Sequence, residues 1–240
     1  MFLREPPPSR YDLRFSIGRI PVRVHPYFWL VAAVLGMNQQ VPKLVLIWVG
    51  AVFFSILFHE FGHAFAALSH RWPARIVLYG AGGFATYQPT RQTLRSVILI
   101  AGAGPCAGFL FAALVVFAVI VSGHSIIFHL LGWSLRINAS APGLSNIPAL
   151  YLVDDLLQIN IYWGLVNLLP IYPLDGGQIA RAIFVNRLSS NGLRLSLQVS
   201  FYTAIALAIV SITAGNGLFL PIFFGFFAFD NYRALKNQMW

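Results

Sequence analysis

The sequence predicts an all-α polytopic membrane protein with about six transmembrane helices and a small membrane-associated β segment. Only 10% of the 240 residues are charged and 58% are hydrophobic, whereas an average soluble domain has about a quarter charged residues. The hydrophobic residues form long runs, and a bilayer core about 30 Å thick requires about 20 such residues per helix. Short alternating or glycine-rich stretches between the runs predict the β segment.

Six apolar runs predict the transmembrane helices. They are residues 26–41, 44–69, 94–121, 151–171, 195–214 and 217–235. The first run is short for a full crossing, and Pro42 and Lys43 mark the turn that follows it. The single cysteine, Cys106, lies inside the third run and predicts no disulfide.

Three stretches differ from spanning helices. Residues 13–17 and 20–24 alternate in polarity on either side of a glycine, which predicts an amphipathic strand pair. Residues 74–88 are apolar, rich in glycine and too short to span, so they predict an extended hairpin or a re-entrant segment. Residues 124–137 predict a helix that lies in the far membrane interface, with Trp133 as an anchor.

The distribution of positive charge predicts the orientation. If the N-terminus is cytoplasmic, all 16 Lys and Arg residues except Lys43 and Arg136 lie on the cytoplasmic side. Because cytoplasmic loops are enriched in Lys and Arg, we expect a multi-pass protein of the cell membrane with both termini in the cytoplasm. The same bias explains the net charge of +9 without a nucleic-acid partner.

The second run contains His59-Glu60-Phe61-Gly62-His63. Residues four apart lie on one face of a helix, so both imidazoles can reach one metal ion. Neutral imidazole suits zinc, and the intervening glutamate of such a helix acts as a general base for water. Ionisable residues in a spanning helix are costly and indicate function. The alternative is a hydrogen-bonded histidine pair beside a neutral glutamate.

A catalytic zinc takes three protein ligands, and Asp175 is the best candidate for the third. At 1.5 Å per residue, His59 and Asp175 both fall in the cytoplasmic half of helices that run inward. The predicted positions of Asp12, Asp154 and Asp155 do not match the depth of His59 in the membrane. Asp175 could instead cap the helix that follows it.

The two motifs together resemble the site-2 protease family of intramembrane zinc metalloproteases. That family pairs HExxH with N-x-x-P-x-x-x-L-D-G, and the segment NLLPIYPLDGG fits this pattern from Asn167 to Gly176. The opening IGRIPVRVHPYFW is similar to the compact branch that includes the sporulation factor proteases. The small-residue motif from Gly102 to Gly108 resembles the family's middle core helix, although such a motif more often reflects plain helix packing.

The resemblance implies an intramembrane metalloendopeptidase with one Zn²⁺ per chain and a membrane-tethered protein as substrate. His59, His63 and Asp175 would bind the metal, and Glu60 would activate water. Asn167 would contact the substrate or the reacting carbonyl, unless it is a helix-packing amide. Residues Gly82 and Gly83 would belong to a β segment that presents an edge to an unwound substrate, or to an ordinary turn.

We therefore expect one transmembrane domain over residues 1–240. It would consist of a cytoplasmic amphipathic arm (1–25), a catalytic core (26–188) and two C-terminal transmembrane helices (189–240). The resemblance also leaves room for a regulatory membrane protein or a homo-oligomer as partner. Two alternative functions remain: a membrane metal-ion transporter that uses the same His/Asp site, and a non-catalytic membrane scaffold.

Overall fold

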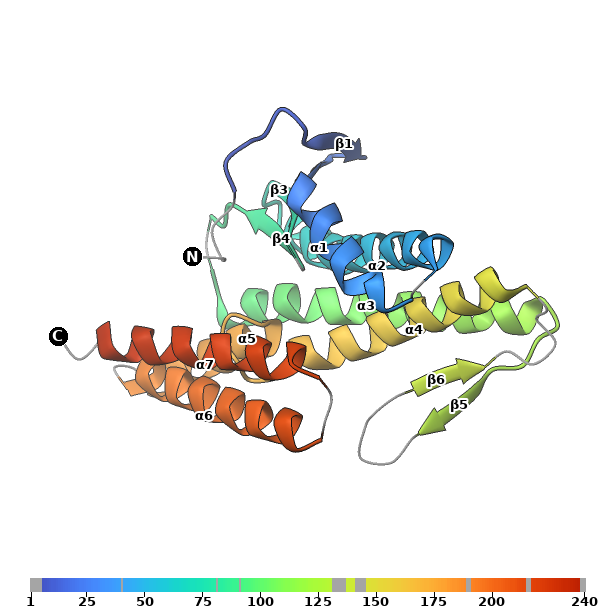
Figure 1. Ribbon diagram of the computed structural model, residues 1–240. Coiled ribbons are helices and arrows are strands. Elements are labelled where there is room, and N and C mark those ends of the chain that lie inside the picture. The colour runs from blue at the N-terminus through green and yellow to red at the C-terminus, as the bar shows by residue number, and fades with distance from the viewer. Residues whose placement is uncertain are drawn as a thin grey trace. The chain divides into compact units, whose positions relative to one another are not determined.

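A computed structural model of the chain describes residues 6–39, 41–80, 82–90, 92–130, 137–140, 146–188, 191–214 and 217–237. The fold is mostly helical and includes two small sheets (Figure 1). The α-helices are α1 (Pro26–Gly36), α2 (Pro42–Ser69), α3 (Leu94–Val121), α4 (Ile147–Asn167), α5 (Asp175–Leu188), α6 (Gly192–Thr213) and α7 (Phe219–Asn237). The strands are β1 (Leu13–Ile17), β2 (Ile20–Val24), β3 (Ala74–Tyr79), β4 (Gly82–Tyr87), β5 (Ile127–Leu130) and β6 (Ile137–Ser140).

Three of the described helices, α2, α3 and α6, are long and apolar enough to cross a membrane. The 28 residues of α2 rise about 42 Å at 1.5 Å per residue, which exceeds the hydrocarbon core of a bilayer. The prediction of a multi-pass helical membrane protein is therefore confirmed. The other predicted spans coincide with α1, α4 and α7, and that these helices also cross the bilayer stays a prediction.

The four-stranded sheet has the order β1-β2-β3-β4. The predicted strand pair β1–β2 is antiparallel, and the glycine-rich stretch forms the antiparallel hairpin β3–β4. Strands β2 and β3 pair in parallel although two helices separate them in the sequence. Alternate side chains of β2 and β3 lie on one buried face of the sheet. They are Ile20, Val22, Val24, Ala74, Ile76 and Leu78.

The predicted interfacial helix over residues 124–137 is wrong where the structure describes this stretch. Ile127–Leu130 and Ile137–Ser140 form a two-stranded sheet instead. Short apolar runs suit a strand and a helix equally well, and the β-branched isoleucines here favour the strand. Trp133, the expected anchor, lies outside the described residues.

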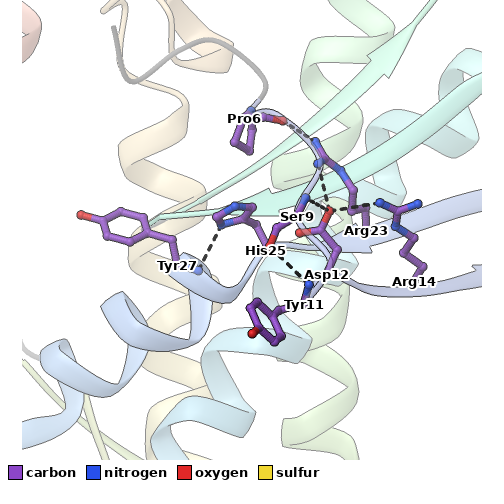
Figure 2. Close-up of polar contacts among 8 residues, drawn as sticks. All are labelled: Pro6, Ser9, Tyr11, Asp12, Arg14, Arg23, His25 and Tyr27. Atoms are coloured by element: carbon purple, nitrogen blue, oxygen red, sulfur yellow. Dashed lines mark hydrogen bonds and ion pairs between the residues drawn. The ribbon is translucent and has the colours of Figure 1, made fainter.

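Polar contacts fix the segment before β1 to the sheet (Figure 2). The Ser9 amide donates to the Asp12 carboxylate at 2.9 Å, and Arg23 donates to Asp12 at 3.2 Å and to the Pro6 carbonyl at 2.9 Å. Burial raises the pKa of Asp12, but the Ser9 amide and the Arg23 and Arg14 guanidinium groups outweigh it, so the pKa lies below its ordinary value. Asp12 is therefore ionised at neutral pH.

Contacts along the chain divide it into two compact units. The first unit consists of Met1–Arg91, Ala103–His129 and Ile137–Gly164, and the second consists of Gln92–Gly102, Leu130–Arg136 and Leu165–Trp240. In the first unit, α2 packs against β3 and β4. In the second unit, α6 packs against both α5 and α7 (Figure 1). The second unit has its own core of apolar side chains, among them Ile171, Leu174, Ala204, Phe224 and Phe227.

Candidate metal centre

Helix α2 carries both predicted imidazole ligands on one face. His59 and His63 are buried, and their Nε2 atoms are 3.2 Å apart. Two nitrogen atoms bound at about 2.0–2.1 Å to one tetrahedral ion would lie roughly 3.3 Å apart. The separation in α2 therefore fits two ligands of a single ion, and the uninterrupted helix sets it through the spacing of four residues.

Helix α3 passes close to these nitrogen atoms at Gly104. A β-carbon added to Gly104 would lie 2.8 Å from His59 Nε2 and still closer to His63 Nε2. Real β-carbons do not approach nitrogen atoms this closely, so only glycine leaves the space beside the two nitrogens open. The sequence motif around Gly104 more often reflects plain helix packing, and it could not reveal which side chains face this glycine.

Glu60 is buried beside strand β4. A β-carbon added to Gly83 would lie 2.5 Å from Glu60 Cγ and 2.9 Å from Glu60 Oε1. Gly83 thus allows the backbone of β4 to pass directly along the Glu60 side chain. Its neighbour Gly82 is less constrained, because an added β-carbon would meet Trp163 at an ordinary 3.8 Å.

A buried hydrogen bond joins α4 to α2 one turn before His59. The Asn160 side chain donates to Ser55 Oγ at 2.8 Å, and both residues are almost fully buried. Ser55 lies four residues before His59 and therefore on the same face of α2. This bond gives the histidine-bearing face of α2 a polar contact with α4 within the first unit.

The second unit presents Asp175 at the end of an irregular segment. Residues 168–174 leave the helical conformation between α4 and α5, and Asp175 is the first residue of α5. Its side chain is buried, with 6% of its surface exposed. Pro170 and Pro173 in this segment lack the amide hydrogens that a continuous helix would require, so the segment depends on other contacts for its shape.

Two side chains from the C-terminal helices hold the segment at Tyr172. The Tyr172 amide donates to Ser200 Oγ of α6 at 2.9 Å, and Asn231 Nδ2 of α7 donates to the Tyr172 carbonyl at 2.6 Å. Ser200 is 1% and Asn231 is 2% exposed. Both peptide groups of Tyr172 are thus satisfied by buried side chains three residues before Asp175. Sequence reasoning missed these residues, although polar residues in apolar helices are a signal of function.

Three of the predicted residues are candidate ligands of one metal ion. His59 and His63 lie in the first unit and Asp175 lies in the second, and all three residues are buried. Two imidazoles and one carboxylate form a donor set that binds zinc and related divalent ions and leaves a coordination position open. Asn167, the last residue of α4, is buried, and its role in substrate contact stays a prediction.

Comparisons with known proteins agree with this arrangement. Residues 47–209 match the sequence profile of Peptidase family M50. A zinc metalloprotease of Methanocaldococcus jannaschii is 31% identical over 181 residues, which are 72% of this chain and 45% of that protein. Stage IV sporulation protein FB of Bacillus subtilis is 28% identical over 188 residues, 75% of this chain and 54% of that protein. The chain thus spans about half the length of these two relatives.

A solved structure has the same fold. The site-2 protease from Methanocaldococcus jannaschii aligns with a TM-score of 0.58 and 22% sequence identity, over 94% of this chain and 95% of that chain. The family match covers more than half of the chain and includes the helix that bears both histidines and the segment that bears Asp175. The chain is a member of peptidase family M50.

Proposed function

We propose that this chain is an intramembrane zinc metalloendopeptidase that hydrolyses peptide bonds of membrane-tethered substrate proteins. The buried pair of His59 and His63 carries this proposal, because their ring nitrogens lie 3.2 Å apart on a helix of membrane length. Asp175, which is buried in the second unit, would be the third ligand. Ionisable residues at such positions indicate a functional site. The M. jannaschii relative is named a zinc metalloprotease, and zinc suits a donor set of two imidazoles and one carboxylate.

The three ligands would hold one Zn²⁺ ion, which when bound supplies Lewis acidity and a water of lowered pKa. Glu60 then acts as the general base: it accepts a proton from the attacking water and passes it to the departing amine. The close passage of β4 at Gly83 limits the positions that the Glu60 side chain can take. Asn167 contributes a polar contact to the substrate or to the reacting carbonyl.

Strand β4 offers a place for the substrate. It is an edge strand of the four-stranded sheet, and all six of its residues are half-buried. An extended peptide can add to such an edge through backbone hydrogen bonds. A substrate bound along Gly82 and Gly83 would lie next to Glu60. Since a helix protects its own peptide bonds, the substrate helix must unwind before it can pair with this edge.

The orientation and the partners form part of the proposal. The excess of basic residues on one side supports cytoplasmic termini, with the site toward the cytoplasmic side of the cell membrane. The protein substrate reaches the site from the lipid bilayer. A regulatory membrane protein or a second copy of the chain would control access to it.

The decisive experiment separates metal binding from cleavage. Purified wild type and Glu60→Gln should both contain about one zinc ion per chain, while His59→Ala should contain none. Incubated with a panel of single-span membrane proteins, only the wild type should produce new N-termini, which mass spectrometry identifies. We expect Glu60→Gln to lose at least about a hundredfold in rate.

Asp154→Asn provides the matched control. It makes the same carboxylate-to-amide change in helix α4, where the amide oxygen can still accept the bond from Gln158. Normal cleavage by Glu60→Gln would disprove the hydrolytic role of Glu60. If this variant instead moved zinc across vesicle membranes as the wild type did, the metal-ion transporter would be the correct function.

A further inference from the structure

The apolar face of the four-stranded sheet is covered over β2 and uncovered over β1. Leu13 pairs with Val24, and Ile17 pairs with Ile20. Opposed residues of an antiparallel pair point to the same face, yet Val24 and Ile20 are buried while Leu13 is 49% and Ile17 is 37% exposed. Phe15, between them on β1, shares this face and is half-buried. Leu13, Phe15 and Ile17 therefore form an exposed apolar strip (the β1 strip) that continues the buried face.

Helix α2 covers the same face at the other edge of the sheet. Gly83 of β4 pairs with Leu78 of β3, and Leu78 pairs with Val24 of β2, so these residues lie on the face of the β1 strip. A β-carbon added to Gly83 would meet Glu60 of α2. Helix α2 is long and apolar enough to cross a bilayer. The face that is uncovered at β1 is therefore the one that a membrane helix covers at β4.

The β1–β2 hairpin is attached closely to the membrane helices. Strand β2 ends at Val24 and α1 begins at Pro26, so a single residue, His25, joins them. The His25 amide donates to the Leu78 carbonyl at 3.0 Å, and His25 Nδ1 accepts from the Tyr27 amide at 3.1 Å (Figure 2). The apolar helix α1 packs against α2, and all of these elements belong to the first compact unit. These contacts hold the β1 strip beside two apolar helices.

The two ends of the β1 strip carry residues that are typical of a membrane interface. Arg19 lies in the turn after Ile17 and is exposed, and no described residue forms a hydrogen bond or ion pair with its side chain. Tyr11 lies two residues before Leu13 and is also exposed, with the Arg10 guanidinium 4.7 Å from the centre of its ring. Tyrosine is enriched at the level of the lipid headgroups, and long basic side chains extend toward them from apolar surroundings.

The other features of β1 limit how deeply it can enter a bilayer. Arg14 and Ser16 alternate with the β1 strip and point to the opposite face, where Arg14 lies 3.4 Å from Asp12 (Figure 2). Within the part of the chain that the structure describes, β1 pairs only with β2. The backbone groups on its outer edge need water or headgroups as partners, which the hydrocarbon core does not supply. The β1 strip can therefore reach the acyl chains only at their boundary with the headgroups.

We propose that the β1 strip contacts the lipid bilayer at the boundary between the headgroups and the acyl chains. Its three apolar side chains lie among the upper parts of the acyl chains, and Arg19 reaches the phosphate oxygens of the headgroups. The sheet is then held by lipid at its β1 edge and by α2 at its β4 edge. This contact involves neither the metal ligands nor Glu60, so it does not depend on the proposed function.

Site-directed spin labelling of the full chain tests the contact in nanodiscs of phosphatidylcholine and phosphatidylglycerol. Cys106→Ala removes the single native cysteine, which is exposed. In this background, Leu13→Cys and Ile17→Cys place a nitroxide on the β1 strip. Arg14→Cys and Ser16→Cys are the matched controls on the opposite face of the same strand. Power saturation compares collisions with oxygen, which concentrates in lipid, and collisions with a water-soluble nickel chelate.

We expect oxygen collisions to exceed nickel collisions several-fold at the Leu13 and Ile17 positions, and the order to reverse at the Arg14 and Ser16 positions. Labels at Leu13 and Ile17 that collide mainly with nickel would show that the strip faces water and would refute the proposal. Labels shielded from both reagents would show that a second copy of the chain covers the strip, which would also refute it. Equal values on the two faces of β1 would exclude a one-sided contact. An unchanged melting temperature shows that each labelled variant is folded.

Discussion

The imidazole ligands and the carboxylate ligand of the candidate metal centre are held in different ways. His59 and His63 belong to one continuous helix of 28 residues, so the geometry of α2 alone fixes their separation. Asp175 follows an irregular segment whose shape depends on side chains from elsewhere in the chain. Its contacts at Tyr172 come from residues 28 and 59 positions away in the sequence.

This difference predicts which substitutions should weaken metal binding. The imidazole pair should tolerate changes outside α2 unless an atom enters the space beside the nitrogens. The carboxylate should respond to changes in α6 and α7, which carry no metal ligand. The variants below test this contrast, and each compares zinc affinity with the melting temperature in order to separate a local effect from general destabilisation.

We expect the largest effect from Gly104→Ala. The added methyl group would occupy the space next to His59 Nε2 and His63 Nε2, and zinc affinity should fall by about a hundredfold. Competition with a chromophoric chelator measures this loss. Gly102→Ala is the control, because a β-carbon there meets nothing within 4 Å. Unchanged zinc affinity in Gly104→Ala would show that the nitrogen atoms do not face the ion.

Gly83→Ala should affect the chemical step and leave the metal in place. The new methyl group would displace the Glu60 side chain by several tenths of an ångström, and misplacement of a catalytic group by 1 Å costs up to about a hundredfold. We expect kcat to fall about tenfold at normal zinc content. Zinc loss in Gly83→Ala would instead assign β4 a role in holding the metal-binding helix.

The smallest effects should come from the contacts at Tyr172. Asn231→Leu removes the donor to the Tyr172 carbonyl, and hydrogen bonds between membrane helices contribute about 0.6 kcal/mol on average. If the zinc-binding conformation loses this stabilisation, zinc affinity should fall about threefold. Ser200→Ala should have a similar or smaller effect.

Ser211→Ala provides the control for Ser200→Ala. Ser211 is also a buried serine of α6, and among the described residues its hydroxyl bonds within its own helix, to the Leu207 carbonyl at 2.7 Å. Equal zinc affinity in the Ser200, Ser211 and Asn231 variants would show that the segment before Asp175 keeps its shape without support from α6 and α7.

Local patterns in the sequence predicted much of the fold. Long apolar runs indicated the helices, because a segment that crosses lipid must satisfy its own backbone hydrogen bonds, and an α-helix does so within the segment. The strand pair β1–β2 followed from alternation around a glycine. The predicted end of the fourth run at 171 was four residues late, since α4 ends at Asn167 before Pro170. A proline disfavours the helical conformation of the residue before it.

Contacts between distant segments could not be predicted in the same way. The parallel pairing of β2 with β3 depends on how α1 and α2 return to the sheet, which no local pattern encodes. The two histidines were predicted from their spacing within one helix. By contrast, the contacts of Ser200, Asn231 and Gly104 depend on which helices pack against each other. Helix pairing cannot be inferred from the local pattern of a single sequence.

The parallel pairing of β2 and β3 also restricts the membrane topology. Hydrogen-bonded neighbours of one sheet must lie on the same side of a bilayer, and Val24 pairs with Leu78. Any crossing that the chain makes after β2 must therefore be reversed before β3 begins. The number of crossings between these strands is even whichever side of the membrane the sheet occupies, so reporters fused just before β1 and inserted just after β4 should always report the same compartment.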